Sequence, residues 1–103
     1  MELKGKTAFV SGSGHNIGRA ITLKFSNLGA NVVVNGLTDP ESAEEVAIEA
    51  RGLGAGAIVA MGNVDDNNQV KEMDKPALEK FGKVDIVVNN AAIRPHISFL
   101  EMD

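Results

Sequence analysis

The sequence of 103 residues contains no cysteine, no tryptophan and no tyrosine, and it has only three prolines. Without cysteine the chain can form no disulfide, no thiolate metal site and no cysteine nucleophile. Its apolar runs, such as residues 32–34 and 57–61, are far too short to cross a membrane, which takes about 20 apolar residues. The first residues also lack the apolar stretch of a secretory signal. We therefore expect no membrane partner and a cytoplasmic location.

The charge balance is mildly acidic. Charged residues make up 23% of the sequence and apolar residues 44%, and the formal net charge is -4. A nucleic-acid-binding protein normally presents a basic patch, so this balance argues against a nucleic-acid partner. The length allows one small domain, residues 1–103, and a chain of this size buries only about 60–65% of its unfolded surface.

Short β-branched segments alternate with segments of helical periodicity along the chain. The expected strands are residues 7–10, 31–35, 57–61 and 84–88. The inner faces of the expected helices carry Ile17, Ile21, Phe25 and Leu28, then Ala43, Val46, Ala47 and Ala50, then Val70, Met73, Ala77 and Phe81. Nearly continuous apolar strands separated by helices indicate an α/β fold with a parallel sheet. Right-handed connections favour a doubly wound, Rossmann-type sheet of strand order 3-2-1-4.

Two prolines bear on the expected helices. Asp39 and Pro40 indicate a helix start, with Asp39 as the N-cap and Pro40 at the first helical position. Pro76 lies inside the third helical segment, where it removes a hydrogen bond and should bend or break the helix. We therefore expect a bend or interruption near Asp74 and Lys75.

A glycine-rich loop follows the first strand and runs from Ser11 to Gly18. Glycines let the backbone turn tightly and let a pyrophosphate approach it, while the start of the following helix faces the phosphates. The spacing does not fit the general pattern Gly-x-Gly-x-x-Gly, because Ile17 occupies the third glycine position. The alternative is a glycine-rich turn that only packs a helix on a strand.

The loop resembles the signature Thr-Gly-x-x-x-Gly-x-Gly of the short-chain dehydrogenase/reductase family. Ser11 replaces the Thr, and Asn16 replaces the middle glycine. Asparagine is the non-glycine residue that best tolerates a positive φ, so the loop can keep its shape. Residues 89–92 are similar to the family's Asn-Asn-Ala-Gly motif, and residues 63–64 resemble the pair that flanks the adenine. The resemblance covers residues 3–103, and its run of motifs is closest to the 3-oxoacyl-thioester reductases.

The resemblance implies an NAD(P)-dependent oxidoreductase that transfers a hydride between a nicotinamide dinucleotide and a small carbonyl, alcohol or acyl-thioester substrate. It assigns the pyrophosphate to Gly12, Ser13, Gly14, His15, Asn16, Ile17 and Gly18. It assigns the adenine to Asn63 and Val64, and the nicotinamide-side ribose to Asn90, Ala91 and Ala92. It implies no metal.

The end of the second strand bears on the choice of cofactor. A carboxylate there would bond the adenosine 2′-hydroxyl and repel a 2′-phosphate, but Asn35 is followed by Gly36 and Leu37. His15 stands where NADP-using members of the family often carry a basic residue, although histidine is only partly charged at neutral pH. An exposed loop histidine is an equally good interpretation. We expect NADP, with NAD as the alternative, and we count Asn35 among the cofactor-site residues.

The family's catalysis resembles a proton relay through a Tyr and a Lys four residues apart, downstream of the Asn-Asn-Ala-Gly motif. This chain has no tyrosine and no obvious replacement, so we expect no catalytic residue in it. We therefore expect a truncated cofactor-binding half that is inactive alone. The alternatives are a non-catalytic NAD(P)-binding module and an inert fragment.

An open sheet edge is a further expectation. Truncation would leave the apolar strand at residues 84–88 without a neighbour on one side, and such edges invite pairing with other chains. We expect the chain to be poorly stable alone or to form a homo-oligomer through this edge.

Overall fold

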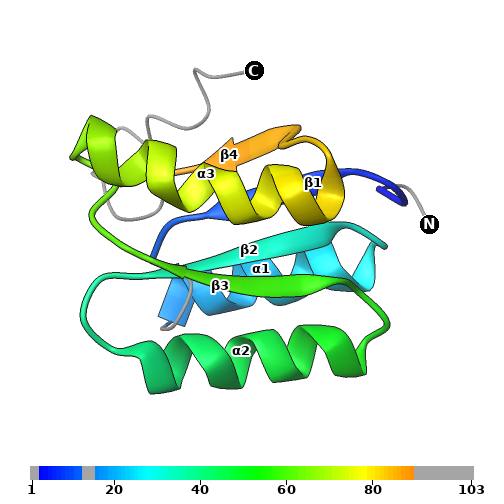
Figure 1. The fold of residues 1–103 in the computed structure, drawn as a ribbon. Helices are drawn as coiled ribbons and strands as arrows, with labels where there is room; N and C mark the ends of the chain where they lie inside the picture. The colour runs from blue at the N-terminus through cyan, green and yellow to red at the C-terminus, as the bar shows by residue number, and fades with distance from the viewer. Residues whose placement is uncertain (1–2, 13–15, 90–103) are drawn as a thin grey trace.

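The computed structural model describes residues 3–12 and 16–89. They form a four-stranded parallel sheet with the order β3-β2-β1-β4 (Figure 1). The strands are β1 (Thr7–Val10), β2 (Asn31–Gly36), β3 (Ala57–Met61) and β4 (Ile86–Val88). The helices between them are α1 (Asn16–Asn27), α2 (Pro40–Gly52) and α3 (Asn67–Phe81). The expected doubly wound order is confirmed.

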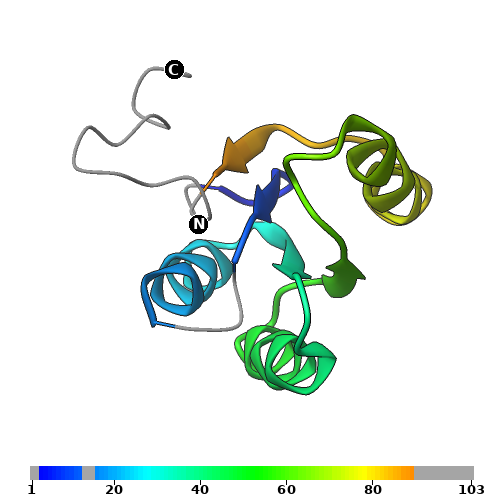
Figure 2. The ribbon, with the colours of Figure 1, turned by 90° about the vertical axis from the view of Figure 1, so that its left-hand side faces the viewer.

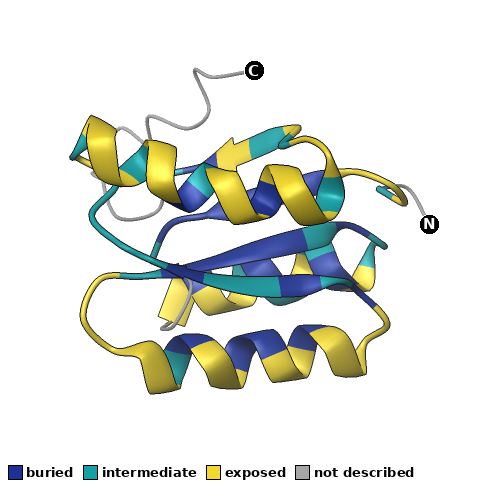
Figure 3. Cartoon of the chain, viewed as in Figure 1, coloured by how far each residue is buried: buried dark blue, intermediate teal, exposed yellow. Residues whose placement is uncertain are grey.

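Helices cover both faces of the sheet. Figure 2 shows α1 and α2 on one face and α3 on the other. Alternate strand residues point to opposite faces, so Val32 and Val34 pack against the alanines of α2, whereas Phe9 and Val33 pack with Met73 of α3. Figure 3 shows the buried residues concentrated on the central strands and on the side of α2 that faces them. The core is therefore two thin apolar layers, one on each side of the sheet.

Helix α1 packs on the sheet through small residues, which the sequence analysis did not predict. Its buried residues are Gly18, Thr22 and Ser26. The hydroxyl of Thr22 donates to the Gly18 carbonyl at 2.7 Å, and that of Ser26 donates to the Thr22 carbonyl at 2.9 Å. Hydroxyls that bond a carbonyl of their own helix can be buried without leaving an unpaired polar group.

The apolar residues of α1 lie around the margin of this contact. Ile17 was expected on the inner face, but its side chain is 60% exposed, so that prediction is wrong. Ile21, Phe25 and Leu28 are half-buried, and Phe25 packs against the cluster that α2 forms with the sheet. The inner face of α1 is thus rotated by about one residue from the one that the apolar residues indicate.

Helix α2 follows its sequence pattern. Asp39 is the N-cap, and its carboxylate accepts hydrogen bonds from the Ser42 N–H at 3.1 Å and from the Ser42 hydroxyl at 2.6 Å. Pro40 is the first helical residue. The predicted inner face is confirmed by the buried residues Ala43, Val46, Ala47 and Ala50.

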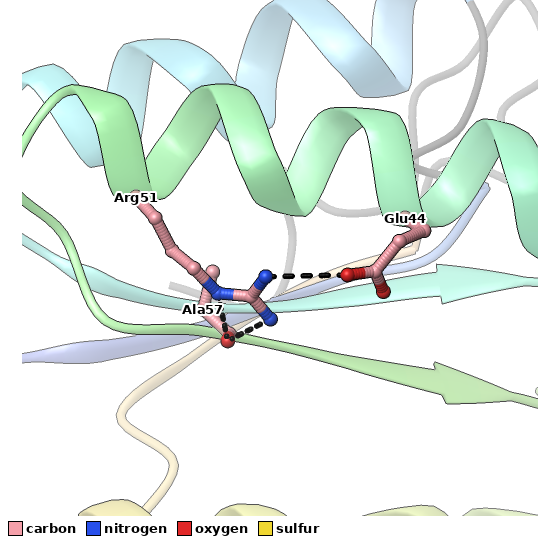
Figure 4. A network of polar contacts seen from close by, with 3 residues as sticks. All are labelled: Glu44, Arg51 and Ala57. Carbon is pink, nitrogen blue, oxygen red and sulfur yellow. Dashed lines mark hydrogen bonds and ion pairs between the residues drawn. The ribbon is translucent and has the colours of Figure 1, made fainter.

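Arg51, near the end of α2, reaches the outer edge of β3 (Figure 4). Its Nε and Nη2 donate to the Ala57 carbonyl oxygen at 3.2 and 2.9 Å, and its Nη1 lies 3.2 Å from the Glu44 carboxylate. The neighbouring Gly56 carbonyl instead accepts the Val32 N–H of β2. Carbonyl groups of successive strand residues point to opposite sides, so Arg51 occupies an outward-facing acceptor of the edge strand.

Helix α3 is continuous through Pro76, so an interruption near Asp74 and Lys75 is ruled out, and a bend there stays a prediction. Pro76 has no N–H, so the carbonyl of Glu72, four residues earlier, lacks its helical donor. Glu72 is exposed, so water can replace that donor. Met73 and Ala77 hold the helix on the sheet, and Gly82 ends it with φ 81°. Burial of one face therefore outweighs the local effect of the proline.

Strand β4 begins at Ile86, two residues later than predicted. Within the described residues it is an edge strand beside β1, and Val87 is 45% exposed. Oligomerisation through this edge stays a prediction. No helix in residues 3–12 and 16–89 is both long and apolar enough to cross a membrane.

Candidate cofactor site

A hollow of about 200 Å³ lies at the carboxyl ends of β1, β2 and β3, where open α/β sheets bind their ligands. Its lining comprises Gly12, Asn35, Leu37, Gly62, Asn63, Val64 and Asp65. Four of these were predicted as cofactor-site residues: Gly12, Asn35, Asn63 and Val64. The sheet order thus brings together residues that lie in three separate loops of the sequence.

The glycine-rich loop has the backbone geometry expected of it at its two described ends. Gly12 has φ 62° and Asn16 has φ 46°, both in the left-handed region. Asn16 is the one described non-glycine residue with a positive φ, which confirms that asparagine can stand in for the middle glycine of the motif. Helix α1 begins at this residue, and Gly18 is buried two residues later. The predicted residues Ser13, Gly14 and His15 lie outside the described residues.

Ser11 ties this loop to the end of β4. Its N–H donates to the Val88 carbonyl at 2.9 Å, and its hydroxyl lies 3.3 Å from the same carbonyl and 3.2 Å from Oδ1 of Asn89. Ser11 is 1% exposed. The replacement of Thr by Ser in the loop motif thus keeps a buried hydroxyl at the junction of the two motifs. The predicted residues Asn90, Ala91 and Ala92 lie outside the described part of the chain.

A second hollow, of about 190 Å³, adjoins this junction on the α3 side of the sheet. It is lined by Phe9, Ser11, Val64, Val70, Asp74, Val87, Val88 and Asn89. Val64 lines both hollows. The loop that follows β3 therefore contributes to both hollows.

Asn35 lies at the centre of the first hollow's polar contacts. Its Oδ1 accepts the Gly12 N–H at 3.2 Å, and its Nδ2 donates to the carbonyls of Ala60 at 2.9 Å and Gly62 at 3.2 Å. The residue is only 3% exposed. Sequence reasoning placed Asn35 at the site but did not find these contacts. The sequence signal that could have indicated them is the position of Asn35, a polar residue directly after three valines in β2.

The loop after β3 is held by a capping arrangement that the sequence analysis missed. Asp66 is the N-cap of α3, and its carboxylate accepts the N–H groups of Gln69 at 3.2 Å and Asn68 at 2.9 Å. These bonds hold the pKa of Asp66 below its usual value. The Gln69 side chain in turn accepts the Asn63 N–H at 2.8 Å. The spacing Asp-x-x-Gln is typical of such caps and could have been recognised.

One residue in the described lining of the first hollow carries a charge. Asp65 is the single charged residue in its described lining, and it is exposed. Its N–H donates to Oδ1 of Asn63 at 2.9 Å, which turns the chain at this point. Arg19, the nearest cation along the first helix, is paired instead with Glu49 of α2 at 2.6 Å. A ligand in the hollow therefore meets one carboxylate, and the rest of the described lining is uncharged.

Comparison with known proteins identifies the class of this chain. The family described as short chain dehydrogenase matches residues 6–103. The chain belongs to the short-chain dehydrogenase family. L-rhamnose 1-dehydrogenase (NAD(P)(+)) of Sphingomonas sp. is 38% identical over 100 residues, which are 97% of this chain and 39% of that protein.

Two further relatives agree with this assignment. The 3-oxoacyl-(acyl-carrier-protein) reductase FabG of Staphylococcus epidermidis is 40% identical over 88 residues, 85% of this chain and 36% of that protein. The crystal structure of hydroxysteroid dehydrogenase from Escherichia coli superposes with a TM-score of 0.79 at 34% identity, covering 85% of this chain and 37% of that one. The chain thus spans between a third and two fifths of the length of these three relatives. The predicted family and fold are confirmed.

Proposed function

We propose that this chain is the nucleotide-binding part of an oxidoreductase that transfers a hydride between a nicotinamide dinucleotide and a carbonyl or alcohol substrate. The observation that carries the proposal is the hollow that joins Gly12, Asn35 and the Asn63–Val64 pair at the carboxyl edge of the sheet. The left-handed backbone of Gly12 and Asn16 supports it, because that turn lets a pyrophosphate approach the start of α1.

In this proposal the chain's residues bind and orient the dinucleotide, which supplies or accepts the hydride when bound. The loop from Gly12 to Gly18 would hold the pyrophosphate, and Asn63 and Val64 would flank the adenine. Residues 90–92 would meet the nicotinamide-side ribose. We assign no catalytic residue to this chain, which has no tyrosine. The names of two relatives, L-rhamnose 1-dehydrogenase (NAD(P)(+)) and 3-oxoacyl-(acyl-carrier-protein) reductase, support a small carbonyl or acyl-thioester substrate.

NADP(H) is our proposed cofactor, and NAD(H) is the alternative. β2 ends at Gly36 without a carboxylate that would repel a 2′-phosphate. The preference for NADP(H) depends on a positive charge at His15, and the carboxylate of Asp65 in the hollow acts against it. The two residues therefore make opposing contributions to the choice of cofactor.

The test is a parallel titration of the chain with NADPH and NADH, followed by nicotinamide fluorescence and by the melting temperature. We expect saturable binding of both, tighter for NADPH, and loss of binding in Gly12→Val. Gly52→Val is the matched control, because a Cβ at Gly52 has no atom within 4 Å and this position lies far along α2 from the hollow. If the folded wild-type chain binds neither nucleotide, the proposal is wrong.

A further inference from the structure

We propose that Asn35 is a positioning residue, whose buried amide sets the shape of the adenosine half of the cofactor site by tying the loop after β1 to the loop after β3. This inference rests on the proposed function. It replaces the direct cofactor contact that the sequence analysis expected of Asn35. The supporting observation is that one side chain bonds the backbone of both loops that line the hollow.

The orientation of the Asn35 amide follows from its surroundings. Gly12 presents an N–H, which requires an acceptor, while Ala60 and Gly62 present carbonyl oxygens, which require donors. Exchanging Oδ1 and Nδ2 would place N–H against N–H and oxygen against oxygen. Two further contacts, from Nδ2 to Sδ of Met73 at 3.2 Å and to the Gly36 carbonyl at 3.4 Å, lie on the same donor side. The network therefore admits one orientation.

Each of the two loops that Asn35 joins presents the backbone of a glycine to it. Gly12 and Gly62 have no side chains, and both adopt φ values that other residues rarely reach, 62° and 157°. Gly62 has a second bond to β2, because its N–H donates to the carbonyl oxygen of Gly36, the residue after Asn35, at 2.9 Å. The distance across the hollow, from the glycine-rich loop to the Asn63–Val64 pair, is thus set by the end of β2.

Burial explains why the effect on a nucleotide would be indirect. Asn35 is 3% exposed, and both of its polar atoms already bond protein groups. A nucleotide could reach the amide only by breaking bonds that a buried amide requires. Asn35 would therefore act through the positions of Gly12 and Gly62, which lie at the surface of the hollow.

Three variants separate this role from general stability. Asn35→Ala removes all of the contacts. Asn35→Asp keeps an acceptor for Gly12 but sets a carboxylate against the carbonyls of Ala60 and Gly62. Val46→Ala is the matched control, because Val46 is 1% exposed in the cluster between α2 and the sheet and does not line the hollow.

The experiment measures the affinity of each folded chain for NADPH, NADH and ADP, the last being a probe of the adenosine half. It also measures amide hydrogen exchange in the ligand-free chains. We expect both Asn35 variants to bind ADP and the dinucleotides about tenfold more weakly, by the same factor for each ligand. We expect faster exchange at Gly12 and Gly62. Val46→Ala should melt at a lower temperature with its affinities unchanged.

The outcomes distinguish this inference from the proposed function. If the folded wild-type chain binds none of the three probes, both are overturned. If wild type binds them and Asn35→Ala binds them equally well, with unchanged exchange at Gly12 and Gly62, the positioning role alone is overturned. Equal losses of affinity in Asn35→Ala and Val46→Ala would also overturn it, because the effect would then follow stability and not the hollow.

Discussion

Asp85 holds both backbone groups of Thr7. Its carboxylate Oδ2 accepts the Thr7 N–H at 2.9 Å, and its own N–H donates to the Thr7 carbonyl at 2.8 Å. A side chain thus takes the place of a backbone acceptor where β1 begins. This substitution is why regular pairing of β4 with β1 starts only at Ile86, although the apolar run in the sequence begins at Val84.

The first prediction concerns acid stability. The hydrogen bond from Thr7, helped by Lys83 and Lys6, holds the pKa of Asp85 below its usual value, although desolvation opposes this. A carboxylate with a lowered folded pKa stabilises the native state above the unfolded pKa of about 4, and this stability is lost as the pH falls through the folded pKa. We expect the free energy of unfolding to fall with pH below about pH 4, and less steeply in Asp85→Asn.

Urea denaturation between about pH 6 and about pH 3 measures this dependence. Asp66→Asn should also flatten the profile, because the backbone N–H groups of Gln69 and Asn68 lower the pKa of Asp66. The double variant should be the flattest. Profiles for Asp85→Asn and wild type that run parallel through this range would contradict the assignment.

The second prediction concerns the buried hydroxyl of Thr7. Its Oγ1 has no hydrogen-bond partner among the described residues, and the residue is 0% exposed. Because burying an unpaired hydroxyl is unfavourable, Thr7→Val should raise the free energy of unfolding by about 1 kcal/mol. Thr22→Val is the control, since the Thr22 hydroxyl is bonded to Gly18, and it should bring no such gain. Chemical denaturation of the three chains decides the matter, and a less stable Thr7→Val would refute the prediction.

The third prediction contrasts two glycines. A Cβ at Gly56 would lie 2.7 Å from Oδ1 of Asn31 and 2.9 Å from a ring carbon of Phe81, so Gly56→Ala should destabilise the chain by about 1–3 kcal/mol. A Cβ at Gly52 would meet nothing within 4 Å, and Gly52→Ala at the end of α2 should stabilise it by about 0.5–1 kcal/mol. The signs should be opposite in thermal or urea unfolding. Equal effects would show that the space around Gly56 adapts freely.

The fourth prediction concerns the choice of nucleotide. Removing the charge of Asp65, the one charged residue in the described lining of the hollow, should increase affinity for NADPH relative to NADH in Asp65→Asn. His15→Gln should shift the ratio the other way. Asp74→Asn serves as the control, because Asp74 lines the second hollow and not the first. The ratio of the two dissociation constants at low and high salt measures the effect, and a ratio unchanged by Asp65→Asn would exclude this role.

Periodicity predicted the fold well where apolar side chains determine the packing. It identified the inner faces of α2 and α3, because these rest on valines, alanines and Met73. It failed for α1, where Thr22 and Ser26 are buried after satisfying their hydroxyls within the helix. A pattern of apolar residues cannot reveal a helix face that is buried although it is polar, because its hydroxyls bond carbonyls of the same helix.

The site was predictable to a similar extent. Motif spacing and parallel topology placed Gly12, Asn35 and the Asn63–Val64 pair at one edge of the sheet, where the hollow lies. The partners of Asn35 and Asp85 were not predictable, because Gly62 is 27 residues from Asn35 and Thr7 is 78 residues from Asp85. Contacts of that range depend on the register of the assembled sheet, which no local pattern in the sequence specifies.

The guanidinium of Arg51 that covers the Ala57 carbonyl also makes the two edges of the sheet unequal as sites for pairing with another strand. A strand approaching β3 from outside would have to displace Arg51 from this carbonyl and from Glu44 before it could form its first bond. At β4 no described side chain plays such a part, and Val87 stands open to solvent. Within the described fold, the β3 edge is therefore blocked by a side chain, whereas the β4 edge is open. We therefore expect a further strand, from this chain or another, to pair with β4 and not with β3.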